Sequence, residues 1–143
     1  MMKKILLASL AGLMLAAPSA HAADAMDPQL REKARRAVDG GLHYLRGQQA
    51  ENGSVMNSVG ITALSLRAFL ESHRGYNEGD GPFITRQVEY ILGKKNDDGS
   101  ISESLQNRSY NTAVVLNALA ATKNPKYEPI IAGGRKYLVG HQI

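Results

Sequence analysis

Apolar positions recur with the period of an α-helix over most of the chain, and the pattern is of two kinds. In the first kind, apolar residues recur every three or four positions and charged residues occupy the opposite face of the helix, as over residues 28–45. Asp27 suits the N-cap of this segment and Pro28 its first turn. The same pattern returns over residues 82–92 and starts again at Pro129, so three amphipathic helices are predicted.

The second kind of segment is apolar nearly all round. Residues 59–70 carry one charge, on Arg67, and residues 112–121 carry none. A helix of this composition must be buried on most of its sides. No stretch alternates with period 2, so strands are not expected. The two kinds of helix predict an all-α fold of two layers, in which the charged faces of the amphipathic helices point outward.

The first segments form an internal repeat. Residues 38–55 align with residues 84–101 at an offset of 46, without gaps, and a third copy begins at an offset of 47 before the chain stops. The second segments align as 62–69 with 112–119, at an offset of 50. A unit of this length predicts stacked helical hairpins, here about two and a half repeats over residues 28–74, 80–123 and, in part, 128–143.

Two copies contain the pattern Tyr-[Leu/Ile]-x3-[Gln/Lys]-x3-Gly-Ser-[Val/Ile], and the third begins it with Tyr137, Leu138 and Gln142. The residues that define it, and that we expect to be structural, are Tyr44, Gln49, Gly53, Tyr90, Gly99, Tyr137 and Gln142. Glycine at a tight turn supplies backbone angles that other residues avoid. This pattern resembles the repeat of the prenyltransferase and squalene oxidase/cyclase superfamily. The resemblance extends over nearly all of residues 34–143.

The resemblance implies an α/α toroid, a ring of helical hairpins around an apolar cavity, and an isoprenoid or other lipid as ligand. Val55 and Ile101 stand where the family has Trp, and Lys95 replaces the second Gln, so the copies are degenerate. HEAT-like or armadillo-like solenoids are the alternative architecture, because their repeats have a similar length.

Residues 1–22 are predicted to be a secretory signal peptide. Lys3 and Lys4 precede an apolar run over residues 5–17, and Ala20-His21-Ala22 offers a small-x-small cleavage site. The apolar run is too short to span a bilayer. Removing 22 of the 143 residues leaves 121, which form one repeat domain over residues 23–143. The sequence therefore predicts a periplasmic or extracellular protein without a transmembrane span in its mature chain.

Charge and composition narrow the chemistry. The net charge of +4 falls to +2 once Lys3 and Lys4 leave with the signal peptide, which removes most support for nucleic-acid binding. The chain contains no Cys, so disulfides, thiolate nucleophiles and Cys-ligated zinc are excluded. The zinc site of protein prenyltransferases therefore cannot form as it does in that family.

No catalytic motif is found. The acid motif of the terpene cyclases, Asp-x-Asp-Asp, is absent, and the only paired carboxylates, Asp97 and Asp98, fall in a repeat turn. His43, His73 and His141 are too scattered to predict a metal site. We therefore assign no catalytic, cofactor-binding or metal-binding residue from the sequence, and name no cofactor.

Two functions remain open at this point. The first is a lipid-binding toroid or the remnant of a terpene cyclase-like enzyme, read as the N-terminal part of a longer ring because the third copy is unfinished. The alternative is a non-catalytic helical-repeat module that binds another envelope protein. The basic stretch over residues 31–36 is interpreted as a solvated helix face, with contact to anionic lipid headgroups as the alternative.

Overall fold

The computed structural model describes residues 26–142, and within that range it is all helical, as predicted, with no strand. Helix α1 spans Pro28–Gly47, α2 Val59–Glu71, α3 Pro82–Leu92, α4 Arg108–Ala121 and α5 Glu128–Gly140. Two short 3-10 helices, η2 over Glu78–Asp80 and η3 over Pro125–Tyr127, precede α3 and α5. The predicted signal peptide lies outside the described residues. None of the described helices is long and apolar enough to cross a membrane.

The helix ends follow the capping chemistry of the sequence with one difference. The Asp27 side chain accepts a hydrogen bond from the backbone N–H of Gln29, so it caps α1 as expected. Helix α4 begins at Arg108, four residues before the predicted Thr112. The first turn of α4 is polar, so the apolar pattern of the sequence does not include it. Asn107, in the left-handed conformation with φ of 57°, sets the start instead.

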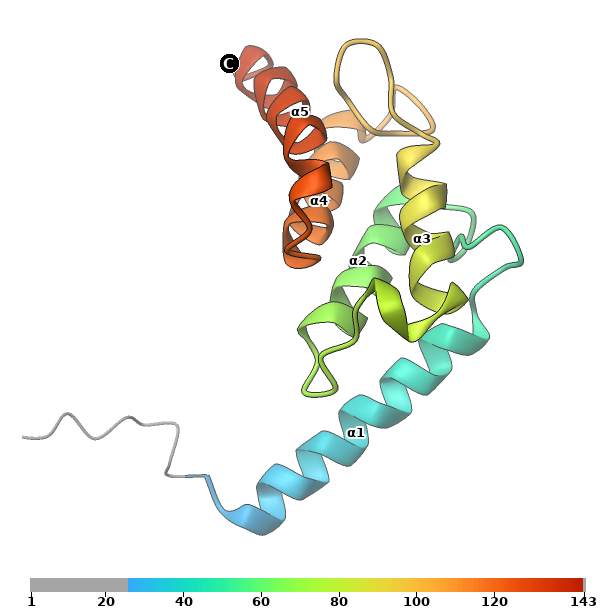
Figure 1. Cartoon of the computed structure of the whole chain (residues 1–143), viewed down its shortest axis with the longest axis vertical. Helices are drawn as coiled ribbons and strands as arrows, with labels where there is room; N and C mark the ends of the chain where they lie inside the picture. The colour runs from blue at the N-terminus through green and yellow to red at the C-terminus, as the bar shows by residue number, and fades with distance from the viewer. Residues whose placement is uncertain (1–25, 143) are drawn as a thin grey trace, which may run out of the picture.

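The two inner helices, α2 and α4, pack side by side, and each carries one further helix (Figure 1). Helix α3 packs on α2, and α5 packs on α4. The side chains between them form one core, whose most buried members are Val59, Ala63, Leu66, Ile84, Ile91, Ile101, Val115, Ala118 and Leu119. Each amphipathic helix after the first therefore rests on the inner helix that precedes it in the chain.

Helix α1 departs from this scheme and from the prediction that apolar faces point inward. Only one of its 20 residues, Leu42, is buried, and the helix extends away from the body (Figure 1). Leu30, Val38 and Tyr44 on its apolar side are exposed. The physical reason is position: no inner helix precedes α1 among the described residues, so its apolar face has no helix to cover.

Candidate functional site

The first repeat turn packs on the next amphipathic helix. Gly53 has φ of +88°, and a Cβ at this position would overlap the backbone carbonyl of Arg86 in α3. The Gln49 side-chain amide donates to the carbonyl oxygens of Gly53, at 3.3 Å, and of Phe83, at 3.1 Å. The Gln49 amide therefore joins the turn to the start of α3.

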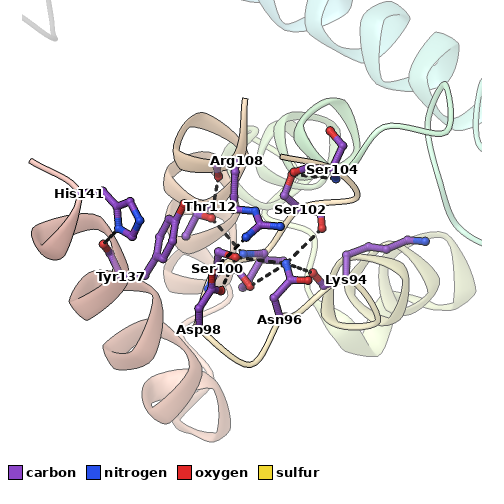
Figure 2. Close-up of polar contacts among 11 residues, drawn as sticks. Lys94, Asn96, Asp98, Ser100, Ser102, Ser104, Arg108, Thr112, Tyr137 and His141 are labelled. Atoms are coloured by element: carbon purple, nitrogen blue, oxygen red, sulfur yellow. Dashed lines mark hydrogen bonds and ion pairs between the residues drawn. The ribbon is translucent and has the colours of Figure 1, made fainter. Parts of the chain in front are cut away.

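The second turn packs on the following amphipathic helix in the same way as the first, through its glycine. Gly99 has φ of +87°, and a Cβ here would lie 2.8 Å from the carbonyl oxygen of Gly133 in α5. The Asn96 amide donates to the carbonyl oxygens of Lys94 and Ser102 and to the Ser100 hydroxyl, all within the turn (Figure 2). Asn96 therefore supplies the hydrogen bonds inside the turn, next to Lys95, but does not make the link to the following helix that Gln49 makes.

The Asx-Gly-Ser part of each turn forms the same local hydrogen bonds. The Asn52 side-chain oxygen accepts from the backbone and hydroxyl of Ser54, and Asp98 accepts from both groups of Ser100. Asp98 also pairs with Arg108 at 3.1 Å. The hydrogen bonds from Ser100, assisted by Arg108, lower the pKa of Asp98 below its ordinary value. This carboxylate is held as a structural anion.

A buried threonine fixes each turn to the inner helix that follows it. The backbone N–H of Val55 donates to the Thr62 hydroxyl at 2.9 Å, and that of Ile101 donates to the Thr112 hydroxyl at 3.0 Å. Each hydroxyl in turn donates to a carbonyl one helical turn earlier. The two aligned halves of the repeat are joined through this contact.

The other motif residues differ between copies. Tyr44 is 64% exposed, Tyr90 is half-buried, and Tyr137 is only 7% exposed. The Tyr137 ring lies 4.1 Å, centre to centre, from that of His141 (Figure 2). Gln142 is exposed. The tyrosine position is therefore progressively more buried from the first copy to the third.

The three histidines considered from the sequence do not come together. His73 lies 3.3 Å from Asp39, His43 is exposed on α1, and Nδ1 of His141 donates to the Tyr137 carbonyl oxygen at 2.8 Å. Among residues 26–142, no three His, Asp or Glu side chains are grouped so that they could hold a metal ion.

The strongest polar cluster was missed by sequence reasoning. Glu78 in η2 accepts from Lys126 and from the Tyr127 hydroxyl, both at 2.8 Å, and from the Asn124 amide at 3.0 Å. Burial opposes ionisation of Glu78, but these three hydrogen bonds and the Lys126 charge outweigh it and lower its pKa. The cluster ties the two inter-repeat connections together. The capping box formed by Asn77 and Asp80 marks the start of η2 in the sequence, but it does not signal these long-range contacts.

An apolar hollow lies along α1. A groove of about 520 Å³ is bordered on one side by α1 and on the other by the C-terminal end of α2. Its lining residues are Val38, Gly41, Leu42, Tyr44, Leu45, Ala68, Glu71 and Ser72. It contains one ionisable carboxylate and no histidine, so it offers an apolar binding surface and no acid–base pair.

No protein-family model, curated protein or solved structure matches this chain. The functional conclusion therefore rests on the geometry of the described residues. The apolar residues on the open side of α1, such as Val38 and Tyr44, are exposed and do not belong to the core. This open side of α1 is the candidate binding site.

Proposed function

We propose that this protein is a non-catalytic helical-repeat module of the bacterial envelope that binds another protein through the apolar side of α1. The observation that carries the proposal is the exposure of that side. Val38 and Tyr44 are exposed, next to the groove with α2. A contiguous exposed apolar surface on a soluble domain marks an interaction site more often than scattered apolar residues do.

The groove is held in a fixed shape, which favours binding. Arg74, in the connection after α2, donates two hydrogen bonds to Asp39 of α1, at 2.9 and 2.7 Å. These bonds, together with the Arg74 charge, lower the pKa of Asp39. The Arg46 guanidinium lies 4.2 Å from the centre of the Phe83 ring. A surface that is ordered before binding loses less conformational entropy when a partner arrives.

Val38 is the position from which this proposal is tested. A photo-activated cross-linking amino acid is placed at Val38 in the secreted protein, and a second protein carries it at Arg36, on the opposite face of α1. We expect one dominant cross-linked product from position 38 and none from position 36. Equal patterns of products from both positions, or no product from either, would contradict a specific interaction through this face.

Binding of an isoprenoid or another lipid is the second candidate. The apolar lining of the same groove supports it, as does the likeness of the repeat turn to that of the prenyltransferase and squalene cyclase-like family. Under this second proposal, the chain is a member of that family, forms part of an α/α toroid and is periplasmic or extracellular. A fluorescent polyprenyl probe should then bind saturably at micromolar concentration, and Val38→Asp should abolish the signal. Absence of saturable binding to the unaltered protein would exclude this candidate.

A further inference from the structure

The repeat register shows which part of a neighbour the open face of α1 is built for. At the offset of 46, the α1 positions Ala37, Val38, Gly41, Leu42 and Leu45 correspond to Phe83, Ile84, Gln87, Val88 and Ile91 of α3. All five of these α3 residues are buried, and α3 packs on the inner helix α2. The corresponding α1 positions, Leu42 and Leu45 apart, are largely uncovered.

Two adjacent glycines of α5, Gly133 and Gly134, show which contacts a glycine pair makes in this kind of helix. A Cβ on Gly134 would lie 2.6 Å from the Leu116 side chain of the inner helix α4, so glycine permits close approach of that helix. The carbonyl of the preceding residue, Gly133, receives the Gly99 turn, as described above. The pair thus accepts an inner helix and a repeat turn.

Helix α1 carries the same pair at the same place, with its neighbours missing. Gly40 and Gly41 correspond to Gly133 and Gly134 through the aligned tyrosines Tyr44 and Tyr137. Two glycines in the middle of a helix cost about 1 kcal/mol each relative to Ala. A Cβ on either would meet no other group of residues 26–142 within 4 Å. Nothing in the described fold therefore uses these glycines.

The inner layer is open on the same side. On α2, Ile61 is 37% exposed and Ala68 is exposed, whereas their counterparts on α4 at the offset of 50, Asn111 and Ala118, are 7% and 0% exposed. The α4 residues are covered because α4 packs on α2. Both layers therefore end at the α1 side with surfaces that elsewhere contact a preceding repeat.

We propose that the partner of this module is itself a helical-repeat polypeptide, which places an uncharged inner-type helix and the glycine turn before it over Gly40 and Gly41. This inference rests on the proposed function and names the class of partner. The helix would enter the groove between α1 and α2, with its small side chains against Gly41 and Val38. The turn would sit on the carbonyl of Gly40, as the Gly99 turn sits on Gly133.

A second copy of this chain does not fit the same place. Its inner helices α2 and α4 already carry α3 and α5 on the faces concerned. If α4 of one copy were stacked on α1 of another, α1 would have to occupy the place on α4 that α5 of the first copy already fills. The occupant is therefore a different polypeptide with an inner helix free on that face.

The charge of α1 adds a second property of the partner. Helix α1 begins eight residues before the position that corresponds to Pro82, the start of α3. The extension carries Arg31, Lys33 and Arg35 against the single carboxylate Glu32. An antiparallel partner helix would bring its C-terminal end here, where cations are favourable. Acidic residues following that helix would strengthen the pairing.

The test supplies such a helix from the chain itself. Residues 49–81, which contain a repeat turn, α2 and its connection, are fused ahead of residue 36 in place of residues 23–35 in the mature chain. Because Pro82 and Arg36 are equivalent positions, the added helix reaches α1 by the same connection that joins α2 to α3. Linkage also raises the effective concentration of the added helix.

A thiol introduced by Val38→Cys reports occupation, because the chain has no other cysteine. We expect the fusion to slow its alkylation about tenfold or more relative to the unfused chain, as for a site exposed only by local opening. The fused protein should also have a higher Tm. A thiol introduced by Arg36→Cys, on the opposite face, should react at the same rate in both chains.

Gly41→Leu in the fused protein should restore fast alkylation and remove the gain in Tm, because the added side chain fills the path of the helix. Gly47→Leu is the matched control; Gly47 also has free space around it, lies outside the face, and should change neither readout. Unchanged alkylation and an unchanged Tm in the fusion would overturn the proposal.

Three further results with the unfused chain would also overturn it. These are protection of the thiol that rises with protein concentration, protection by vesicles containing anionic lipid, and protection when residues 1–22 are retained. They would assign the face to a second copy, to a membrane and to the N-terminal segment. A failed fusion beside a specific cross-link from Val38 would overturn only the class of partner. Failure of both would overturn the proposed function as well.

Discussion

At the scale of single residues, the fold depends on a few positions where backbone geometry leaves no freedom. Gly53 combines φ of +88° with contact against the Arg86 carbonyl, so both strain and overlap oppose any side chain there. The buried N–H of Val55 has the Thr62 hydroxyl as its partner. At each of these positions a single atom determines which residue is tolerated: the absent Cβ of Gly53 and the hydroxyl oxygen of Thr62.

We expect Gly53→Ala to lower the free energy of unfolding by about 2 kcal/mol or more, from backbone strain and overlap with α3. Gly75→Ala is the control, because Gly75 also has positive φ, +61°, but free space around it. It should cost about 1 kcal/mol, from strain alone. Urea denaturation followed by circular dichroism measures both. Equal losses would mean that the turn does not rest on Arg86.

Thr62→Val keeps the shape of the side chain but leaves the Val55 N–H buried without an acceptor, which should cost about 1–3 kcal/mol. Ser65→Ala provides the contrast on the same helix. The Ser65 hydroxyl is buried and has no hydrogen-bond partner in the part of the chain that the structure describes. Its removal should leave stability unchanged or raise it. A Thr62→Val protein as stable as the parent would refute the role of this hydroxyl.

At the scale of elements, the connections between repeats are ordered by polar contacts that local sequence does not reveal. Glu78 contacts residues 46 to 49 positions away, in the connection that leads to α5. The aromatic rings of Phe69, Tyr76 and Phe83 pack edge to face, with centres 5.4–5.8 Å apart, beneath the first connection. The Glu78 contacts depend on the stacking of α2 and α4, whereas the aromatic contacts depend on the packing of α3 on α2.

The Glu78 cluster predicts a pH dependence. The folded-state pKa of Glu78 lies below its ordinary value of 4.5, so the cluster stabilises the fold above that pH and this contribution is lost as the pH falls through the folded-state pKa. Glu78→Gln should therefore be less stable than the parent at pH 7 and should approach it in acid. Glu51→Gln, at an exposed turn position, should follow the parent throughout. Parallel curves for parent and Glu78→Gln would contradict the assignment.

At the scale of the whole molecule, equivalent positions differ according to whether a repeat precedes them. Gly134 faces Leu116, whereas Gly41 faces open space in the described fold. The same chemical change should thus have opposite effects at two aligned sites. This contrast separates what belongs to the repeat from what belongs to its place in the array.

Gly41→Ala should raise the free energy of unfolding by about 0.5–1 kcal/mol, because alanine favours the helix and meets no neighbour. Gly134→Ala should lower it, because the new methyl group would lie 2.6 Å from Leu116. Thermal unfolding of both proteins, compared with the parent, measures the two signs. A loss of stability in both would show that α1 is already covered in solution.

The sequence by itself determined that the chain is helical, where the repeats align and which residues form their turns. Those features are local, because 3.6-residue periodicity, proline at helix starts and glycine at positive φ act within a few residues. It also indicated that α1 has an apolar face. Periodicity, however, says nothing about whether a neighbour covers that face.

Only the tertiary structure decided which polar groups meet across repeats and which faces remain open. Gln49 reaches the Phe83 carbonyl, Glu78 joins the two connections, and Gly40 and Gly41 meet no neighbour in the described fold; each of these depends on residues far away in sequence. Contacts of this kind form when helices stack, and their energy depends on three-dimensional distance. The candidate binding site therefore follows from a tertiary difference: α3 and α5 each pack on an inner helix, whereas the corresponding face of α1 is largely uncovered.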